Sequence, residues 1–475
     1  MSISLGLVVV FTRLLEAEEW GIYSFAKRIA TIGSIITLMG LSVALPRYIP
    51  MMRNKAPHAD VPYRSNAVWL LILSSSAITV LWFGAVFTVG IQLVGDTKTV
   101  YAFYAGGLYL LTLAWLELFN SMLRADHHYR DFNRLGVVNQ LLQLVFGTAL
   151  LLFIGRSASL ALVGSALGLS TAIIVSLYLI RLHGIRLFRW HHIDKDVRSS
   201  LLSYGAPRAP LSLLEELIVA LPVIILGFLG EPIAAGLFAI ANTIIIICVS
   251  VYRPVSVIML PEFSEKIGLN QFASAHRALE LIVQGWWYSS TVMIVLLIAF
   301  ADILIPVIFG ADYRAAVDIL YILLIGVLFL SFYIASYSYA NALMKKPVIM
   351  YCQLAGLAVN AGLIFTMYPI FGSTGIAVAA SFGMAVTGGM LAFILLKSDP
   401  ALFSLLRGLD MLACGLPLAG ILMVNIFLDL TLFNRIVLTI PWVVLYFAAI
   451  HYRKIEWYEY VKKYLRNDRT GRYKT

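Results

Sequence analysis

Charged residues are scarce in this chain, which is 475 residues long. They make up 13% of it, against roughly 25% in a typical soluble domain. Hydrophobic residues make up 61%, and the mean hydropathy is +0.88. This composition indicates an all-α polytopic membrane protein. Although the net charge is +10, no soluble segment is long enough to form a nucleic-acid-binding domain, so we expect no nucleic-acid partner.

Cysteine is also rare, and long loops are missing. All three cysteines, Cys248, Cys352 and Cys414, fall inside apolar runs, where a metal site is not expected. The pairs His127–His128 and His191–His192 lie in short loops without a plausible set of metal ligands. A membrane glycosyltransferase or polymerase needs a sizeable outer loop with acidic catalytic groups, and none is present. We therefore expect no enzyme, no cofactor and no metal.

The sequence consists mainly of long apolar runs. A helix needs about 20 apolar residues to cross a bilayer. Fourteen segments fit, with both termini then on one side: 1–15, 21–45, 66–90, 100–122, 135–155, 158–180, 201–229, 233–260, 281–308, 316–342, 348–370, 374–396, 409–428 and 434–451.

The loops predict the orientation. The even-numbered loops and the tail carry 26 Lys and Arg residues, and the opposite side carries five. Because the positive side of such proteins is cytoplasmic, we expect a multi-pass protein of the cytoplasmic membrane with both termini in the cytoplasm. The basic, aromatic tail from Lys454 is expected to lie on the anionic inner leaflet or to be a solvated topogenic segment.

The sequence also contains an internal repeat, because a shift of 215 residues brings its halves into register. The matches include Leu14 with Leu229, Glu16 with Glu231, Gly21 with Gly236 and Pro46 with Pro261. Six spans per copy make the copies parallel, an arrangement that places a substrate site between halves. The predicted domains are a six-helix bundle at 1–182, a second at 199–397, and two extra helices with the tail at 408–475.

The first segment is short for a spanning helix. Only twelve residues precede Arg13, which is roughly 18 Å of helix against a core of about 30 Å. The repeat also leaves this helix about fifteen residues short of its counterpart in the second copy. We expect either a natural start upstream of Met1 or a short tilted or re-entrant helix.

Two cations lie well inside the second segment. Lys27 and Arg28 are two turns in, where a charge is costly unless it faces protein, water or an anion. Ser24, Lys27, Thr31 and Ser34 recur on one helical face. This polar face predicts a water-filled cavity, and the alternative is that Lys27 reaches the outer interface.

Further cations lie in the second half. Arg208 stands in a segment that Pro207, Pro210 and Pro222 are expected to kink or break, and Arg253 directly precedes Pro254. Together with Lys27 and Arg28 they form a series of cations that an anion could contact in turn as it is translocated. Arginine suits this role because it binds phosphate through forked, charge-assisted hydrogen bonds.

Three carboxylates lie in the same apolar segments: Glu117, Glu215 and Glu216. A structural ion pair between Arg208 and Glu215 is one interpretation, and a proton- or sodium-coupling role for Glu215 or Glu216 is another.

Several stretches resemble a known family. FTRLLEAEEWGIYSFAKRIATIGSIITLMGLSVALPRYIP (11–50), SYGAPRAP (203–210), FGADYRAAVDIL (309–320) and FGSTGIAVAA (371–380) are similar to the bacterial O-antigen and lipid-linked oligosaccharide flippases. These proteins belong to the multidrug/oligosaccharidyl-lipid/polysaccharide (MOP) exporter superfamily.

The resemblance implies a MATE-like fold, with two six-helix bundles in a V around a cavity. It implies flipping of a polyprenyl-pyrophosphate-linked oligosaccharide for polysaccharide or lipopolysaccharide synthesis. Polysaccharide polymerase, glycosyltransferases and membrane lipids would be partners. Two alternatives stay open: a MATE-type cation-coupled antiporter of drugs or metabolites, and a lipid II flippase.

Overall fold

The computed structural model describes residues 2–53, 58–94, 96–189, 193–344 and 347–398, with 439–441, 444 and 446. Within these residues the chain is helical, with short turns and one 3₁₀ helix at Ala311–Tyr313. The predicted all-α class is therefore confirmed. The predicted helices at 409–428 and 434–451, the basic tail and Cys414 lie outside the described residues, apart from isolated positions.

The chain forms two compact units, which are described separately. The first comprises residues 1–240 and 308–313, and the second comprises 241–307 and the chain from 314 onward. This division does not test the predicted domains, which stay a prediction. The helices of the first unit are α1 (Ser2–Leu14), α2 (Ala17–Leu38), α3 (Leu41–Arg53), α4 (Val61–Val94), α5 (Thr97–Ala125), α6 (Tyr129–Phe153), α7 (Ala158–Leu182), α8 (Lys195–Gly205), α9 (Ala209–Phe228) and the start of α10 (Pro232–Ser250).

Two helix breaks of the first unit meet. The predicted span 21–45 breaks at Met39 and Gly40, whose φ angles are +46° and +76°. The span 201–229 breaks between α8 and α9, next to Pro207 as predicted. A Cβ on Gly40 would lie 2.1 Å from the Gly205 carbonyl oxygen, so the two breaks touch through their backbones. Glycine is required at Gly40 both for its positive φ and for this contact.

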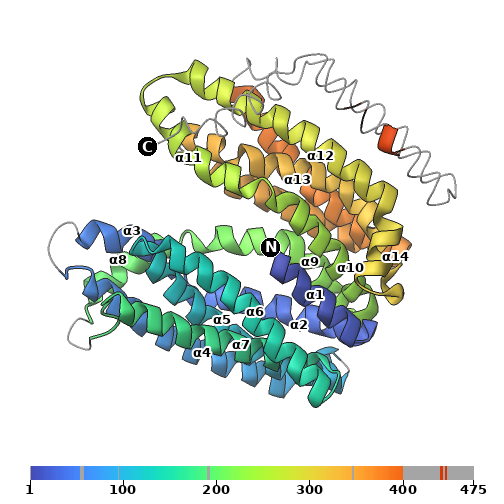
Figure 1. Cartoon of the computed structure of the whole chain (residues 1–475), viewed down its shortest axis with the longest axis horizontal. Coiled ribbons are helices and arrows are strands. Elements are labelled where there is room, and N and C mark those ends of the chain that lie inside the picture. The colour runs from blue at the N-terminus through green and yellow to red at the C-terminus, as the bar shows by residue number, and fades with distance from the viewer. Residues whose placement is uncertain are drawn as a thin grey trace. The chain divides into compact units, whose positions relative to one another are not determined.

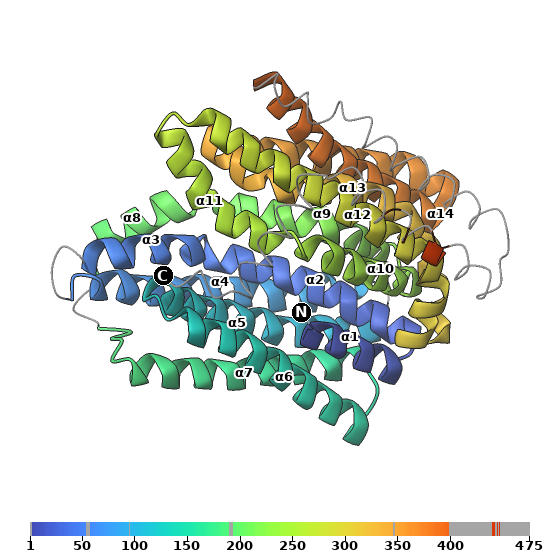
Figure 2. The same cartoon turned by 45° about the horizontal axis from the view of Figure 1, so that its top comes forward.

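Helices α6 and α7 form a tight antiparallel hairpin, and they lie side by side in both views (Figure 1, Figure 2). A Cβ on Gly164 would lie 2.5 Å from the Cα of Gly147, and a Cβ on Gly168 would lie 2.5 Å from the backbone nitrogen of Gln143. Small residues at these positions let the two backbones come close, as is common between helices in membranes.

The second unit holds the rest of α10, α11 (Arg253–Gly268), α12 (Phe272–Ile308), α13 (Ala316–Leu343) and α14 (Val348–Ser398). Its helices are joined by buried hydroxyl contacts: Trp286 Nε1 donates to Ser331 Oγ at 2.7 Å, and the Ser256 and Ser338 hydroxyls are 2.7 Å apart. Helix α14 kinks at Gly372, whose φ is +57°. This kink separates the two predicted spans 348–370 and 374–396.

Ten stretches of the described chain are long and apolar enough to cross a membrane, and the helix Ser4–Leu14 is a shorter apolar one. One of the ten, Val348–Lys397, contains the kink at Gly372 and covers two predicted spans. The protein is thus a multi-pass membrane protein. The count of fourteen stays a prediction, because its last two members fall outside the described residues.

Candidate functional site

The structure pairs Arg28 with Glu216. Arg28 Nη1 donates to Glu216 Oε1 at 2.7 Å, which joins α2 to α9 across 188 residues of sequence. Their side chains are 21% and 24% exposed, so the pair is largely but not fully enclosed. A guanidinium inside a membrane helix needs an anion beside it, and Glu216 supplies one in this conformation.

Lys27 has neutral partners instead. Its Nζ donates to the Tyr23 hydroxyl at 3.0 Å and lies 5.1 Å from the Tyr23 ring centroid and 5.7 Å from that of Tyr109. Both rings attract a cation through their faces, but neither neutralises its charge. Among the described residues, Lys27 has no carboxylate within salt-bridge distance. It is therefore a cation held in place by neutral side chains.

The polar face predicted for this helix is only partly as expected. Ser24 and Ser34 are buried, and the hydroxyls of Thr31 and Ser34 donate to carbonyls of their own helix, at 2.9 Å to Lys27 and 2.7 Å to Thr31. The prediction that the whole face lines a cavity is wrong at the two serines, where α2 packs against protein. Lys27, Arg28 and Thr31 are half-buried.

Arg208 lies elsewhere, at the N-terminus of α9. Its Nη1 donates to the Tyr204 carbonyl at 2.9 Å, and its Cζ lies 3.7 Å from the Tyr204 ring centroid. The Arg47 guanidinium lies over the same ring, at 4.0 Å. Arg208 is exposed at the break between α8 and α9, and the structure groups it with Arg47. The ion pair expected between Arg208 and Glu215 stays a prediction.

Glu117 has its partner in its own helix, and Arg253 belongs to the second unit. Glu117 accepts a hydrogen bond from Arg124 Nη2 at 2.7 Å within α5, so its partner comes from its own helix and not from the Lys27–Arg28 pair. Arg253 is the first residue of α11, in the second unit, and it is exposed.

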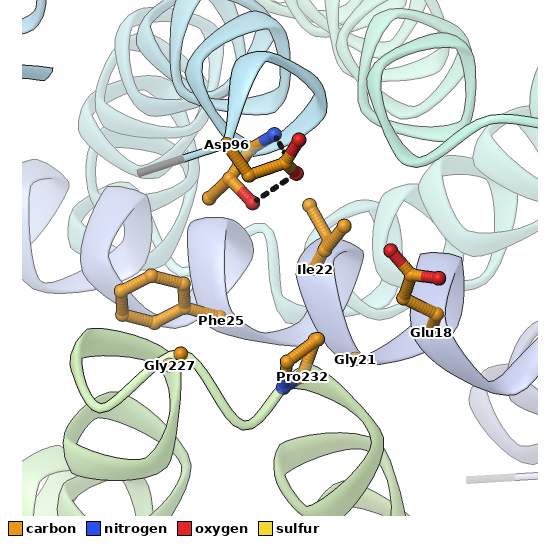
Figure 3. A pocket seen from close by; sticks show the side chains of 9 residues that line it. Glu18, Gly21, Ile22, Phe25, Asp96, Gly227 and Pro232 are labelled. Carbon is orange, nitrogen blue, oxygen red and sulfur yellow. Dashed lines mark hydrogen bonds between the residues drawn. The ribbon is translucent and has the colours of Figure 1, made fainter. Parts of the chain in front are cut away.

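A cavity of about 180 Å³ lies in the first unit between α2, the start of α5, and the α9–α10 turn (Figure 3). Its two acids already have partners: Asp96 accepts from the backbone of Thr99 at 3.2 Å, and Glu18 pairs with Lys98 at 3.4 Å. Drug-sized ligands occupy roughly 300–1,000 Å³, so this cavity is too small for a lipid-linked glycan.

The close approach beside this cavity supports the predicted repeat. A Cβ on Gly21 would lie 1.7 Å from the Pro232 carbonyl oxygen and 3.2 Å from the Gly236 nitrogen. Trp20 Nε1 also donates to the Gly236 carbonyl, at 3.1 Å. Gly21 and Gly236 are partners under the 215-residue shift, and residues near an axis that relates two copies are expected to meet their own counterparts.

With this geometry in view, the chain can be compared with known proteins. The profile of a family described as polysaccharide biosynthesis protein matches residues 1–266, which is more than half of the chain and includes Lys27, Arg28 and Glu216. The chain belongs to this family. No curated protein sequence matches it.

Several solved structures share the fold of this chain. A lipid II flippase MurJ, in an inward closed conformation, aligns with a TM-score of 0.73 at 15% identity over 95% of this chain and 97% of its own. An inward-facing multidrug resistance MATE family transporter of the MOP superfamily aligns with a TM-score of 0.69 at 13% identity, over 86% and 96%. The Vibrio cholerae MATE transporter VcmN, in its bent form, gives 0.52 at 15%, over 85% and 99%. The predicted polysaccharide biosynthesis family is thus confirmed by the profile match, and the predicted MATE-like fold by the solved structures.

Sequence reasoning missed several residues of the site in this family member. Tyr23 and Tyr109, which hold Lys27, read as ordinary aromatic residues of apolar helices. Arg47 was counted only among the loop charges, although its neighbours in PRYIP, a proline and a tyrosine, mark the end of a span rather than a free loop. A cation next to an aromatic residue at a helix end is the sequence pattern that could have identified Arg47 as a candidate site residue.

Proposed function

We propose that this protein flips a polyprenyl-pyrophosphate-linked oligosaccharide across the cytoplasmic membrane for polysaccharide or O-antigen synthesis. Both termini would then be cytoplasmic, as the distribution of Lys and Arg predicts. The observation that carries the proposal is the Arg28–Glu216 ion pair beside Lys27 and its neutral partners, inside helices covered by the polysaccharide biosynthesis profile. Membership of the family supports a lipid-linked substrate, and these cations supply the chemistry to hold its phosphates.

The two cations would act in different ways. Lys27 offers an ammonium that the Tyr23 hydroxyl already orients. Arg28 is held by Glu216 until a diphosphate replaces that carboxylate, because a diphosphate offers more acceptor oxygens and a higher charge. Glu216 would thus keep Arg28 desolvated but neutralised between transport cycles, and it would compete with substrate for the guanidinium.

Arg208 and Arg253 are proposed as further contacts for the phosphates or the sugars. Arg208 shares Tyr204 with Arg47, and a tyrosine flanked by cations at a helix break offers both a hydroxyl for sugar and charge for phosphate. Outward movement of an anion is favoured by an inside-negative membrane potential, by about 2.3 kcal/mol per charge per 100 mV. The potential alone would therefore drive part of the movement of a headgroup with about two charges, without a dedicated proton site. Polymerase and glycosyltransferases are the proposed partners.

The main alternative is a cation-coupled antiporter. Such a transporter needs a carboxylate available to a proton, a sodium ion or an organic cation. In this conformation two of the three candidate carboxylates, Glu216 and Glu117, are each held by an arginine at 2.7 Å, and that observation favours the flippase. A lipid II flippase would use the same cations, so a choice of hosts must separate the two.

The test is complementation in three hosts: one deficient in its O-antigen flippase, one depleted of its lipid II flippase, and one deficient in drug efflux. We expect surface glycan to return in the first host. Lys27→Gln and Arg28→Gln should each lower it about tenfold or more, since a hydrogen bond to a charged group contributes about 1.5–3 kcal/mol. Arg130→Gln, at an exposed position of α6, is the matched control. Rescue of the second or third host instead would replace this proposal by the corresponding alternative.

A further inference from the structure

Two histidines and an aspartate lie together at the open end of the α6–α7 hairpin. His128 is the residue that precedes α6, Asp131 lies in the first turn of α6, and His183 directly follows α7. The other end of the hairpin is closed by the short turn 154–157. The three side chains therefore come from two helix ends that the antiparallel packing of α6 and α7 brings side by side (Figure 1).

Their geometry is close to that of a metal site. His183 Nε2 lies 2.8 Å from Asp131 Oδ2, and the His128 and His183 rings stack at 3.7 Å with an interplanar angle of 15°. One donor atom from each residue lies within 4.8 Å of the other two. Ligands at about 2.0–2.2 Å from a tetrahedral zinc ion lie roughly 3.4 Å apart. The donor of His128 must therefore come closer to the other two for the set to close around an ion.

The backbone that carries these residues is already fixed. Helix α5 ends in a turn in which His127 has φ +62° and the His128 nitrogen donates to the Leu123 carbonyl at 2.9 Å. Helix α7 ends with the His183 nitrogen donating to the Leu179 carbonyl at 3.0 Å, followed by Gly184 at φ +66°. With the backbones of α6 and α7 in contact along the hairpin, the two helix ends cannot drift apart easily. The donors are thus preorganised by the fold.

We propose that His128, Asp131 and His183 bind a divalent transition-metal ion of the zinc class, with water completing its coordination. Two imidazoles and a carboxylate suit zinc, cobalt, nickel or copper, whereas magnesium and calcium prefer a shell of oxygen ligands. A simple histidine–aspartate hydrogen bond would explain His183 and Asp131, whereas the stacking of His128 on His183 brings a third donor within 4.8 Å of both. Arg134 lies 3.8 Å from Asp131 Oδ1, so Oδ2 is left to face the imidazoles.

The bound ion ties the start of α6 to the end of α7. It acts as a clamp on the open end of the hairpin, and it restricts any movement in which these two helix ends separate. The site is independent of the proposed flippase function, because none of its ligands belongs to the Lys27–Arg28–Glu216 cluster.

The experiment measures metal binding on the purified full-length protein in detergent, with an affinity tag that contains no histidine. Co²⁺ absorption should show one ion per chain in a site that includes imidazole nitrogen, and Zn²⁺ should displace it in competition with a chromophoric chelator. His128→Gln and His183→Gln should each weaken Zn²⁺ binding by about 10–100-fold or more, the range seen even for loss of a residue that only orients a ligand. His127→Gln is the matched control, since His127 contacts Tyr129 at 3.2 Å and is not part of the ligand set. It should leave the affinity unchanged.

A second measurement uses the unaltered chain, so that a folding defect in a variant cannot obscure the result. Acylation by diethyl pyrocarbonate is mapped by mass spectrometry with and without Zn²⁺. Zn²⁺ should protect His128 and His183 and leave His127 reactive. Equal reactivity of the three histidines in both conditions, or equal Zn²⁺ affinity of the wild type and the His128→Gln/His183→Gln double variant, would overturn the proposal.

Discussion

Replacement of Glu216 should show whether this residue only forms a structural ion pair with Arg28 or also competes with the substrate for it. At an effective dielectric constant of 20, two unit charges about 4 Å apart attract by about 4 kcal/mol. Loss of one partner from a fully buried pair costs about 3–5 kcal/mol, and an exposed pair contributes under about 1 kcal/mol. Because Arg28 and Glu216 are 21% and 24% exposed, we expect an intermediate coupling, about 2 kcal/mol.

The assay is a double-mutant cycle with Arg28→Gln, Glu216→Gln and the double variant. Each single variant should lower the free energy of unfolding by about 2 kcal/mol, and the double variant should be destabilised by less than the sum of the two. Binding of a pyrophosphate-bearing lipid should respond differently. Arg28→Gln should weaken it, whereas Glu216→Gln should strengthen it by up to about 30-fold, because substrate no longer has to displace a carboxylate.

The pair Glu117–Arg124 is the matched control, with the same 2.7 Å contact and no role in the proposed site. Glu117→Gln should lower stability without changing the affinity for lipid pyrophosphate. If Glu216→Gln weakens lipid binding as much as Arg28→Gln does, Glu216 does not compete with substrate and the proposed exchange is wrong. If the cycle gives a coupling below about 0.5 kcal/mol, solvent screens the pair more than its burial suggests.

Three further predictions follow from particular contacts. Arg64→Leu should lower the free energy of unfolding by about 3 kcal/mol or more, measured by denaturant titration, because it removes the guanidinium that contacts the buried Asp60 and Asp126 at 2.5 and 2.8 Å and leaves Asp126 with the half-exposed Arg53. Gly21→Ala should reduce the yield of folded protein in size-exclusion chromatography, since its Cβ would lie 1.7 Å from a backbone oxygen, while Gly84→Ala, with no neighbour within 4 Å, should be neutral or slightly stabilising. Lys27→Met should keep the thermal midpoint within a few degrees and abolish complementation, because the Tyr23 hydroxyl can lose this donor without leaving a buried charge.

The sequence was sufficient to predict most of the fold. Apolar length predicted the membrane-spanning class, and Pro207 predicted the break that the structure shows between α8 and α9. The break at Met39 and Gly40 was not predicted. A glycine inside an apolar helix carries no signal of its own, and this one is fixed by contact with Gly205, 165 residues further along the chain.

Less of the candidate site than of the fold could be predicted from the sequence. Spacing placed Lys27 and Arg28 inside a span, but it could not predict that Glu216 rather than Glu215 meets Arg28, because neighbours on a helix differ by about 100° in direction. The histidine cluster was missed for a similar reason. His128 was seen only with His127, and its partners Asp131 and His183 become visible only once α6 and α7 pack antiparallel.

The repeat explains which positions serve the fold and which serve transport. Some positions with a role in the backbone are the same in both copies: Gly21 matches Gly236, where the two chain segments meet, and Pro46 matches Pro261. The positions proposed to hold the substrate differ. Under the same 215-residue shift, Lys27 and Arg28 fall on Asn242 and Thr243, which are polar but uncharged. A duplicated gene begins with two identical sites, so charge at one copy and its absence at the other reflects divergence under different constraints. If the cations were needed only to orient or solubilise the helices, the second copy would need them too. Arg208 and Arg253, the other proposed contacts, lie in the second copy, so the two copies carry their cations at different positions. This difference is what an asymmetric substrate, with its charge at one end of a lipid, would be expected to select.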